Sequence, residues 1–132
     1  MTIIESTAEL NLPVAKVYTF LADMNNHQQL MPENIYNWSS TEDEASFTIQ
    51  NMAKLAIRIS SRIQDQELVA LPTEKPPFDI ELKWTVADNN QGGTIAKLFI
   101  SADLNMMMKM LAAGPLQKLA DHQTERLTQV LR

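Results

Sequence analysis

The stretch FDIELKWTVADNNQGGTIAKLFISA (residues 78–102) sets the architecture expected for this chain. In its first part, from Phe78 to Val86, apolar side chains stand at every second position and polar or charged ones stand between them. This period of two predicts a β-strand with one buried and one exposed face. Residues 88–93 have turn chemistry, and a second alternating segment follows them. Two strands joined by so short a turn pair antiparallel.

The same alternation continues outward from this hairpin and predicts seven strands. Their expected ranges are residues 2–10, 35–40, 45–50, 55–63, 68–71, 78–86 and 94–104. Short polar turns separate the strands from residue 35 onward, so these strands are antiparallel neighbours. One face of each strand is apolar and the other carries charge, which predicts a sheet that is covered on one side only.

Three helical segments accompany the strands. The first follows Pro13 and has apolar residues at helical spacing, and a second, short helix is expected at about residues 25–30. Residues 105–132 form the third, whose apolar stripe covers the sheet. Gly114 and Pro115 lie inside this last helix, and a proline in that position predicts a kink or a break.

Length and composition narrow the classes of protein. The 132 residues, 45% of them hydrophobic and 20% charged, predict one globular domain over residues 1–132. The absence of cysteine excludes disulfides, thiolate catalysis and cysteine-based zinc sites. A formal charge of −5 argues against a nucleic-acid partner. No apolar run approaches the roughly 20 residues of a membrane span, and no targeting segment is evident. We therefore expect a cytoplasmic protein without membrane insertion.

Residues 10–23, LNLPVAKVYTFLAD, resemble the strand–proline–helix entry of the SRPBCC superfamily. This START-like group includes polyketide cyclases, lipid-transfer domains and chaperone co-activators. Residues 23–32, the strand of residues 78–86 with its hairpin, and NMMMKM at residues 105–110 are also similar to small bacterial members. The resemblance spans the whole chain. It implies an α+β helix-grip fold, in which a seven-stranded curved antiparallel sheet wraps around the long C-terminal helix. Two short helices lie between the first two strands, and an apolar cavity lies between sheet and helix.

The predicted ligand-binding residues are the large side chains on the inner strand faces and on the facing turns of the last helix. They are Trp38, Phe47, Ile57, Leu82, Trp84, Leu98, Ile100, Met107, Met110 and Leu111. Half of the chain's eight methionines fall within residues 106–110, and flexible thioethers suit a surface that repacks around a guest. Packing in a core is the alternative role for each of these residues. So many large inner side chains predict a small cavity or a filled core.

The sequence offers no cluster of catalytic groups, and we predict no metal and no cofactor. The two histidines, His27 and His122, have polar neighbours, which predicts exposed side chains. The charged strand residues all share the face opposite the apolar one: Arg58, Arg62, Asp79, Glu81 and Lys83. The polar side chains expected toward the cavity are those of Ser6, Asn37 and Thr94.

The sequence leaves three functions open. The first is intracellular binding of a small hydrophobic or amphipathic molecule, such as a lipid, an aromatic compound or an isoprenoid. The second is an enzyme of the cyclase or dehydratase type, which requires an ionisable side chain in the cavity. The third is a protein-interaction module with a filled core and an exposed apolar patch formed by Met24, Leu30, Met31, Ile35 and Tyr36. We expect a monomer or a weak homodimer.

Overall fold

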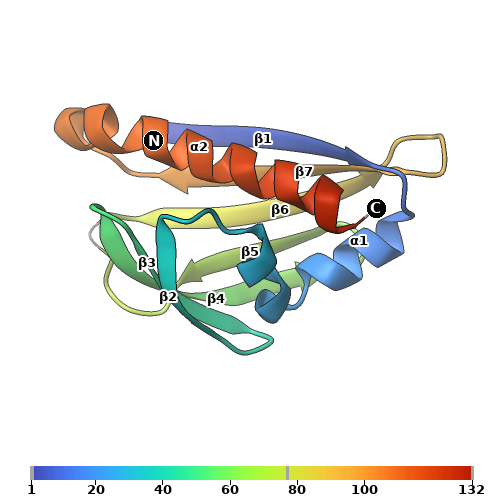
Figure 1. Cartoon of the computed structure of the whole chain (residues 1–132), viewed down its shortest axis with the longest axis horizontal. Coiled ribbons are helices and arrows are strands. Elements are labelled where there is room, and N and C mark those ends of the chain that lie inside the picture. Colours follow the sequence, from blue (N-terminus) through green and yellow to red (C-terminus); the bar gives the residue numbers. More distant parts are fainter. Residues whose placement is uncertain (1, 77, 132) are drawn as a thin grey trace.

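Figure 1 shows a curled sheet with a long helix laid along it. The computed structural model describes residues 2–76 and 78–131. Its elements follow the predicted order: β1 (Thr2–Leu10), α1 (Val14–Leu21), the 3-10 helix η1 (Met24–Leu30), β2 (Ile35–Ser40), β3 (Glu44–Ile49), β4 (Ala53–Ile63), β5 (Glu67–Pro72), β6 (Ile80–Asp88), β7 (Thr94–Ala102) and α2 (Met106–Val130). The differences from the expected ranges are confined to the ends of the elements.

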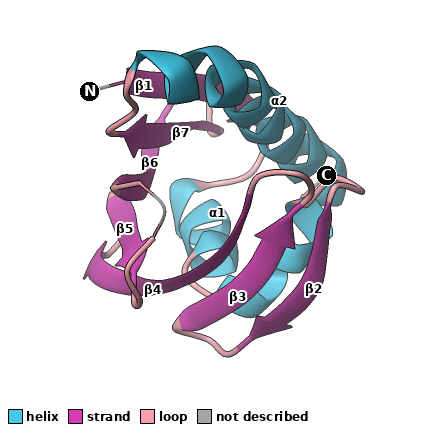
Figure 2. Ribbon diagram, turned by 90° about the vertical axis from the view of Figure 1, so that its left-hand side faces the viewer, coloured by secondary structure: helices cyan, strands magenta, loops and turns pink. Residues whose placement is uncertain are grey.

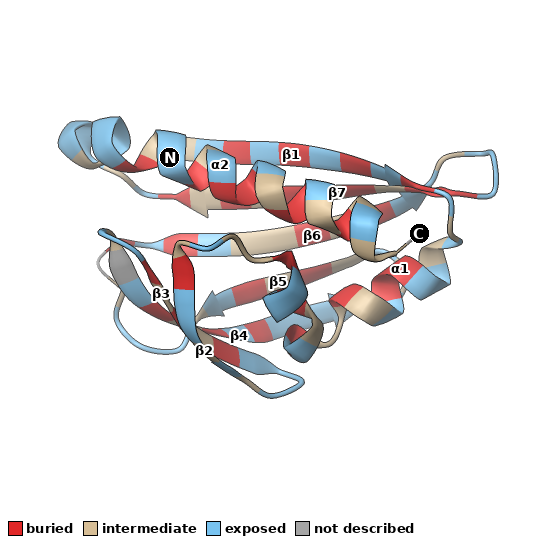
Figure 3. Cartoon of the chain, in the orientation of Figure 1, coloured by how far each residue is buried: buried red, intermediate tan, exposed pale blue. Residues whose placement is uncertain are grey.

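The strands form a single seven-stranded sheet in the order β1-β7-β6-β5-β4-β3-β2. All its pairs are antiparallel, and each strand pairs with its neighbour in sequence, except that β1 pairs with β7. Figure 2 shows the sheet curling between its two edge strands, with α2 lying across the opening. Along β1 and β7 every second residue is buried, as Figure 3 shows. The predicted α+β helix-grip architecture is confirmed.

Apolar packing and hydrogen bonds hold α2 against β1 and η1. The buried residues of the helix form one stripe: Ala112, Leu116, Leu119, Ala120, Gln123, Thr124 and Leu127. The hydroxyl of Ser6 on β1 donates to the carboxylate of Asp121 at 2.7 Å and lies 2.7 Å from the hydroxyl of Thr124. Further along, Arg126 Nε donates to the backbone oxygen of Gln29 in η1 at 3.2 Å. The helix is thus fixed at one edge of the sheet.

The sequence left open a kink or a break at Gly114 and Pro115, and the structure shows no break. α2 runs as one α-helix through both residues. Because proline has no backbone N–H, the carbonyl of Leu111 lacks its usual partner. Leu111 and Pro115 are both exposed, so water can bind the free carbonyl, which lowers the cost of continuing the helix.

A β-bulge in β4 reverses two of the predicted faces. The register with β5 shifts between Ile59 and Ser61, after which Arg62 pairs with Leu68. Directly paired residues share a face, so Arg62 turns to the concave side and Ile63 to the outside, where 43% of it is exposed. The guanidinium donates to the backbone oxygen of Ala22 at 2.8 Å and pairs with Asp43 at 2.9 Å. Arg62 therefore ties the end of α1 to the β2–β3 hairpin.

We expect Pro115→Ala to raise the free energy of unfolding by about 1–3 kcal/mol, because alanine restores a backbone hydrogen bond inside a continuous helix. Equilibrium urea unfolding followed by circular dichroism measures the change. Lys118→Ala, at an exposed position of the same helix, is the control and should stay within about 0.5 kcal/mol of the parent. A less stable Pro115→Ala protein would contradict the continuous helix.

Candidate functional site

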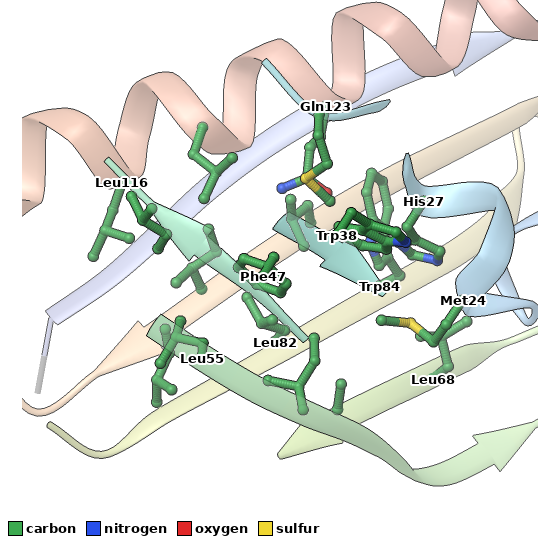
Figure 4. Close-up of a pocket in the computed structure, with 18 residues that line it drawn as sticks. Met24, His27, Trp38, Phe47, Leu55, Leu68, Leu82, Trp84, Leu116 and Gln123 are labelled. Atoms are coloured by element: carbon green, nitrogen blue, oxygen red, sulfur yellow. The ribbon is translucent and has the colours of Figure 1, made fainter. Parts of the chain in front are cut away.

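An internal cavity lies between the concave face of the sheet, η1 and α2 (Figure 4). Its volume is about 40 Å³. That is space for a few water molecules, and it is well below the roughly 300 Å³ at which small-molecule pockets begin. The eighteen lining residues are Met24, His27, Met31, Trp38, Phe47, Ile49, Leu55, Ile57, Leu68, Ala70, Ile80, Leu82, Trp84, Leu98, Ile100, Leu116, Leu119 and Gln123.

Seven of the ten predicted ligand-binding residues lie in this lining. They are Trp38, Phe47, Ile57, Leu82, Trp84, Leu98 and Ile100. All seven come from strands, and the alternation of faces assigned six of them, all except Trp38, to the inside. The inner-face prediction thus located the sheet wall of the cavity.

The three predicted residues on the last helix do not reach the cavity. Met107, Met110 and Leu111 are 73%, 82% and 68% exposed. Figure 1 shows why: the first turns of α2 extend past the end of β1, so no strand lies opposite them. The helical wall is formed later, by Leu116, Leu119 and Gln123. These three positions belong to the apolar stripe that the sequence predicts for residues 116–131.

His27 is the main correction to the site. The sequence predicted a solvated side chain, but His27 is 4% exposed and lines the cavity. Its Nε2 lies 2.8 Å from the backbone oxygen of Leu21. A carbonyl can only accept, so Nε2 carries the proton and Nδ1 holds a lone pair. The ring also packs edge-on against Trp84, with 6.4 Å between ring centroids.

Burial keeps His27 neutral. Desolvation lowers the pKa of its imidazole, while the hydrogen bond to Leu21 and the charge of Asp23 act in the opposite direction. Burial is the largest of these causes, because a low-dielectric setting disfavours the charged form. At neutral pH the imidazole of His27 is therefore an uncharged polar group in the cavity wall.

Trp38 and Phe47 close the side of the cavity formed by β2 and β3. Their rings stack with centroids 5.3 Å apart and planes 14° apart. The indole Nε1 of Trp38 donates to the hydroxyl of Ser40 at 2.9 Å, and that hydroxyl donates to Asn25 at 2.7 Å. Trp38 is half-buried on an edge strand. It therefore lies at the boundary between the cavity and solvent.

The other polar residues expected toward the cavity have different roles. Ser6 binds α2, as described above, and the buried hydroxyl of Thr94 donates to the backbone oxygen of Leu12 at 2.7 Å. Asn37 is exposed and adopts a left-handed backbone conformation, with φ of 55°. The polar groups that do line the cavity are His27, Gln123 and the two indoles. Of these only His27 is titratable near neutral pH.

The apolar patch that the interaction hypothesis placed around η1 and β2 is absent. Met24, Leu30 and Ile35 are buried and Met31 is half-buried, which leaves Tyr36 as the exposed member. Four exposed apolar residues instead gather at the start of α2: Met106, Met107, Met110 and Leu111.

No lining residue of the cavity is an aspartate, glutamate, lysine or arginine. Within residues 2–76 and 78–131, no three histidine or acidic side chains gather closely enough to hold a metal ion. In the same ranges, no helix combines the length and apolar character needed to cross a membrane. The electrostatic character of the site is therefore set by neutral dipoles in an apolar wall.

Comparison with known proteins identifies the fold. Neither a protein-family model nor a curated protein sequence matches the chain. Among solved structures, XoxI from Bacillus cereus matches with a TM-score of 0.78 at 10% identity, over 99% of this chain and 96% of that one. A START superfamily protein from Mycobacterium smegmatis matches with a TM-score of 0.67 at 14% identity, over 97% and 98%. The Aha1 dimer from Colwellia psychrerythraea matches with a TM-score of 0.69 at 12% identity, over 99% and 96%. The chain has a START-like fold.

The buried His27 makes stability depend on pH. Its folded-state pKa lies below the unfolded value of 6.5, so the unfolded chain binds the proton more tightly. The free energy of unfolding should then fall as the pH is lowered below about 6.5. Urea unfolding measures this change: between pH 7.5 and about 5, the free energy of unfolding should fall less in His27→Gln than in the parent protein. His122→Gln, which keeps His27, should retain the parental loss, and equal slopes in all three proteins would contradict the prediction.

Proposed function

We propose that this protein is a cytoplasmic binding protein for a small hydrophobic or amphipathic molecule, held in the cavity between the sheet and α2. The observation that carries the proposal is an interior space, lined by residues without formal charge, at the point where the helix crosses the curled sheet. Removal of apolar surface from water, at about 25 cal/mol per Å², supplies the affinity. Gln123 and His27 contribute the few polar groups that such pockets use for orientation.

Binding must widen the cavity, because about 40 Å³ does not hold an organic guest. The most adaptable part of the wall is formed by Met24 at the start of η1, by Met31 directly after η1 and by Trp38 on β2. Methionine side chains change shape at low cost, and β2 is an edge strand with a register shift between Tyr36 and Ser39. The main contacts of α2 are with β1, β7 and η1. We therefore expect the guest to enter between α2 and the β2–β3 hairpin.

Naphthalene is a suitable first probe because it is apolar, uncharged and small. Isothermal titration calorimetry measures its affinity. The chain's only two tryptophans, Trp38 and Trp84, both line the cavity, so their two indole N–H signals in NMR spectra report the site of binding. We expect Phe47→Leu to bind naphthalene about fivefold more tightly than the parent protein, because the smaller side chain leaves room inside and reduces the cost of opening.

Phe99→Leu provides the matched control. Phe99 lies on the other face of β7, where Lys83 Nζ is 5.8 Å from its ring centroid, so the substitution should leave naphthalene binding unchanged. If neither the parent protein nor Phe47→Leu binds naphthalene, the proposed function is wrong. The protein would then be a filled domain whose surface carries the function.

A further inference from the structure

Gln123, a polar side chain in the cavity wall, makes no hydrogen bond with the residues that the structure describes. Gln123 is 5% exposed, and Figure 4 shows it pointing from α2 toward the cavity. In the described part of the chain, every fully enclosed side-chain nitrogen or oxygen has a hydrogen-bond partner. The amide of Gln123 has none there, so its polar atoms are not fully enclosed, and the residue lines the cavity. An amide in an apolar wall needs a hydrogen-bond partner, and its accessible atoms leave this place to water or to a guest.

His27 and Trp84, which both carry ring nitrogens, line the same cavity. The Nε2 proton of His27 is engaged by Leu21, which leaves the Nδ1 lone pair as an acceptor. The indole of Trp84 is 3% exposed and packs against the imidazole of His27. The hydrogen bond from Arg126 to Gln29 brings the turn of α2 that follows Gln123 against η1, which carries His27. Gln123, His27 and Trp84 thus come from α2, η1 and β6.

These groups are all uncharged, and no charged side chain lines the cavity. A carboxylate or an ammonium group that entered would lose its hydration without gaining an ionic partner. A hydroxyl or a carbonyl group could replace its lost hydrogen bond to water, because the Gln123 amide both donates and accepts hydrogen bonds. The wall therefore distinguishes guests by charge as well as by polarity.

We infer that the cavity takes apolar molecules that carry one uncharged hydrogen-bonding group, a hydroxyl or a carbonyl, and that Gln123 binds this group. This inference rests on the proposed function, since it requires that a guest enters. It excludes carboxylates, such as fatty-acid anions, as preferred ligands. The alternative partner for Gln123 is an internal water molecule, for which the cavity has space.

Three probes with the same ring system test the inference: naphthalene, 2-naphthol and 2-naphthoate at pH 7. Calorimetry with the full chain gives the dissociation constant of each. We expect 2-naphthol to bind at least tenfold more tightly than 2-naphthoate, because the carboxylate stays ionised. Gln123→Met should bind 2-naphthol about tenfold more weakly than the parent protein, as expected for the loss of one hydrogen bond in a buried site. Its affinity for naphthalene should change less than twofold. Methionine keeps the length of the side chain and lacks the amide.

Gln129→Met is the control, because Gln129 is exposed on the same helix; it should bind all three probes as the parent does. Retained naphthalene binding by Gln123→Met shows that this variant is folded. The inference is wrong if naphthalene binds but 2-naphthol binds no more tightly than 2-naphthoate. It is also wrong if Gln123→Met binds 2-naphthol as tightly as the parent protein does. In either case the amide of Gln123 pairs with a water molecule. If no probe binds any of the proteins, the proposed function fails, and the inference fails with it.

Discussion

A single helix has to cover a sheet that is wider than the helix itself. Seven strands at about 4.8 Å spacing span roughly 30 Å, whereas an α-helix with its side chains is about 10 Å across. The structure meets this constraint by curling the sheet and by anchoring α2 near one edge, through Ser6 on β1 and Gln29 in η1. The strands far from that edge must bury their apolar faces against η1 and against one another. The cavity lies where these surfaces meet.

Period-two patterning was enough to predict this architecture because each strand is apolar on one face only. The same pattern located the sheet wall of the cavity, from Phe47 to Ile100. It failed at Ile63, where one extra residue in β4 exchanges the two faces. A bulge leaves no mark in the alternation of hydrophobic residues, so local patterning gives no warning of it.

The residues of the helical wall and the burial of His27 could not be predicted from local patterns, because both depend on how distant parts of the chain pack together. Met107 and Met110 have the composition of a cavity wall, but α2 begins beyond the end of β1 and nothing lies opposite them. His27 has polar neighbours in sequence, yet the short η1 turns its ring onto the carbonyl of Leu21 and the edge of Trp84. Helical phase and strand parity describe one element at a time. Neither describes where two elements end relative to each other.

The small cavity links stability to affinity. The stacked rings of Trp38 and Phe47 and the side chains of Met24 and Met31 form part of the cavity wall, and their contacts stabilise the unliganded fold. On the proposed function, a guest has to displace some of this packing, and an aromatic pair alone contributes about 0.5–1.5 kcal/mol beyond its buried area. Observed affinity then equals the intrinsic affinity reduced by the population of the open form. A closed form favoured by about 1.4 kcal/mol lowers affinity tenfold. On the proposed function, the size of side chains such as Phe47 therefore adjusts how tightly a guest is held, through the cost of opening the cavity as well as through contacts with the guest.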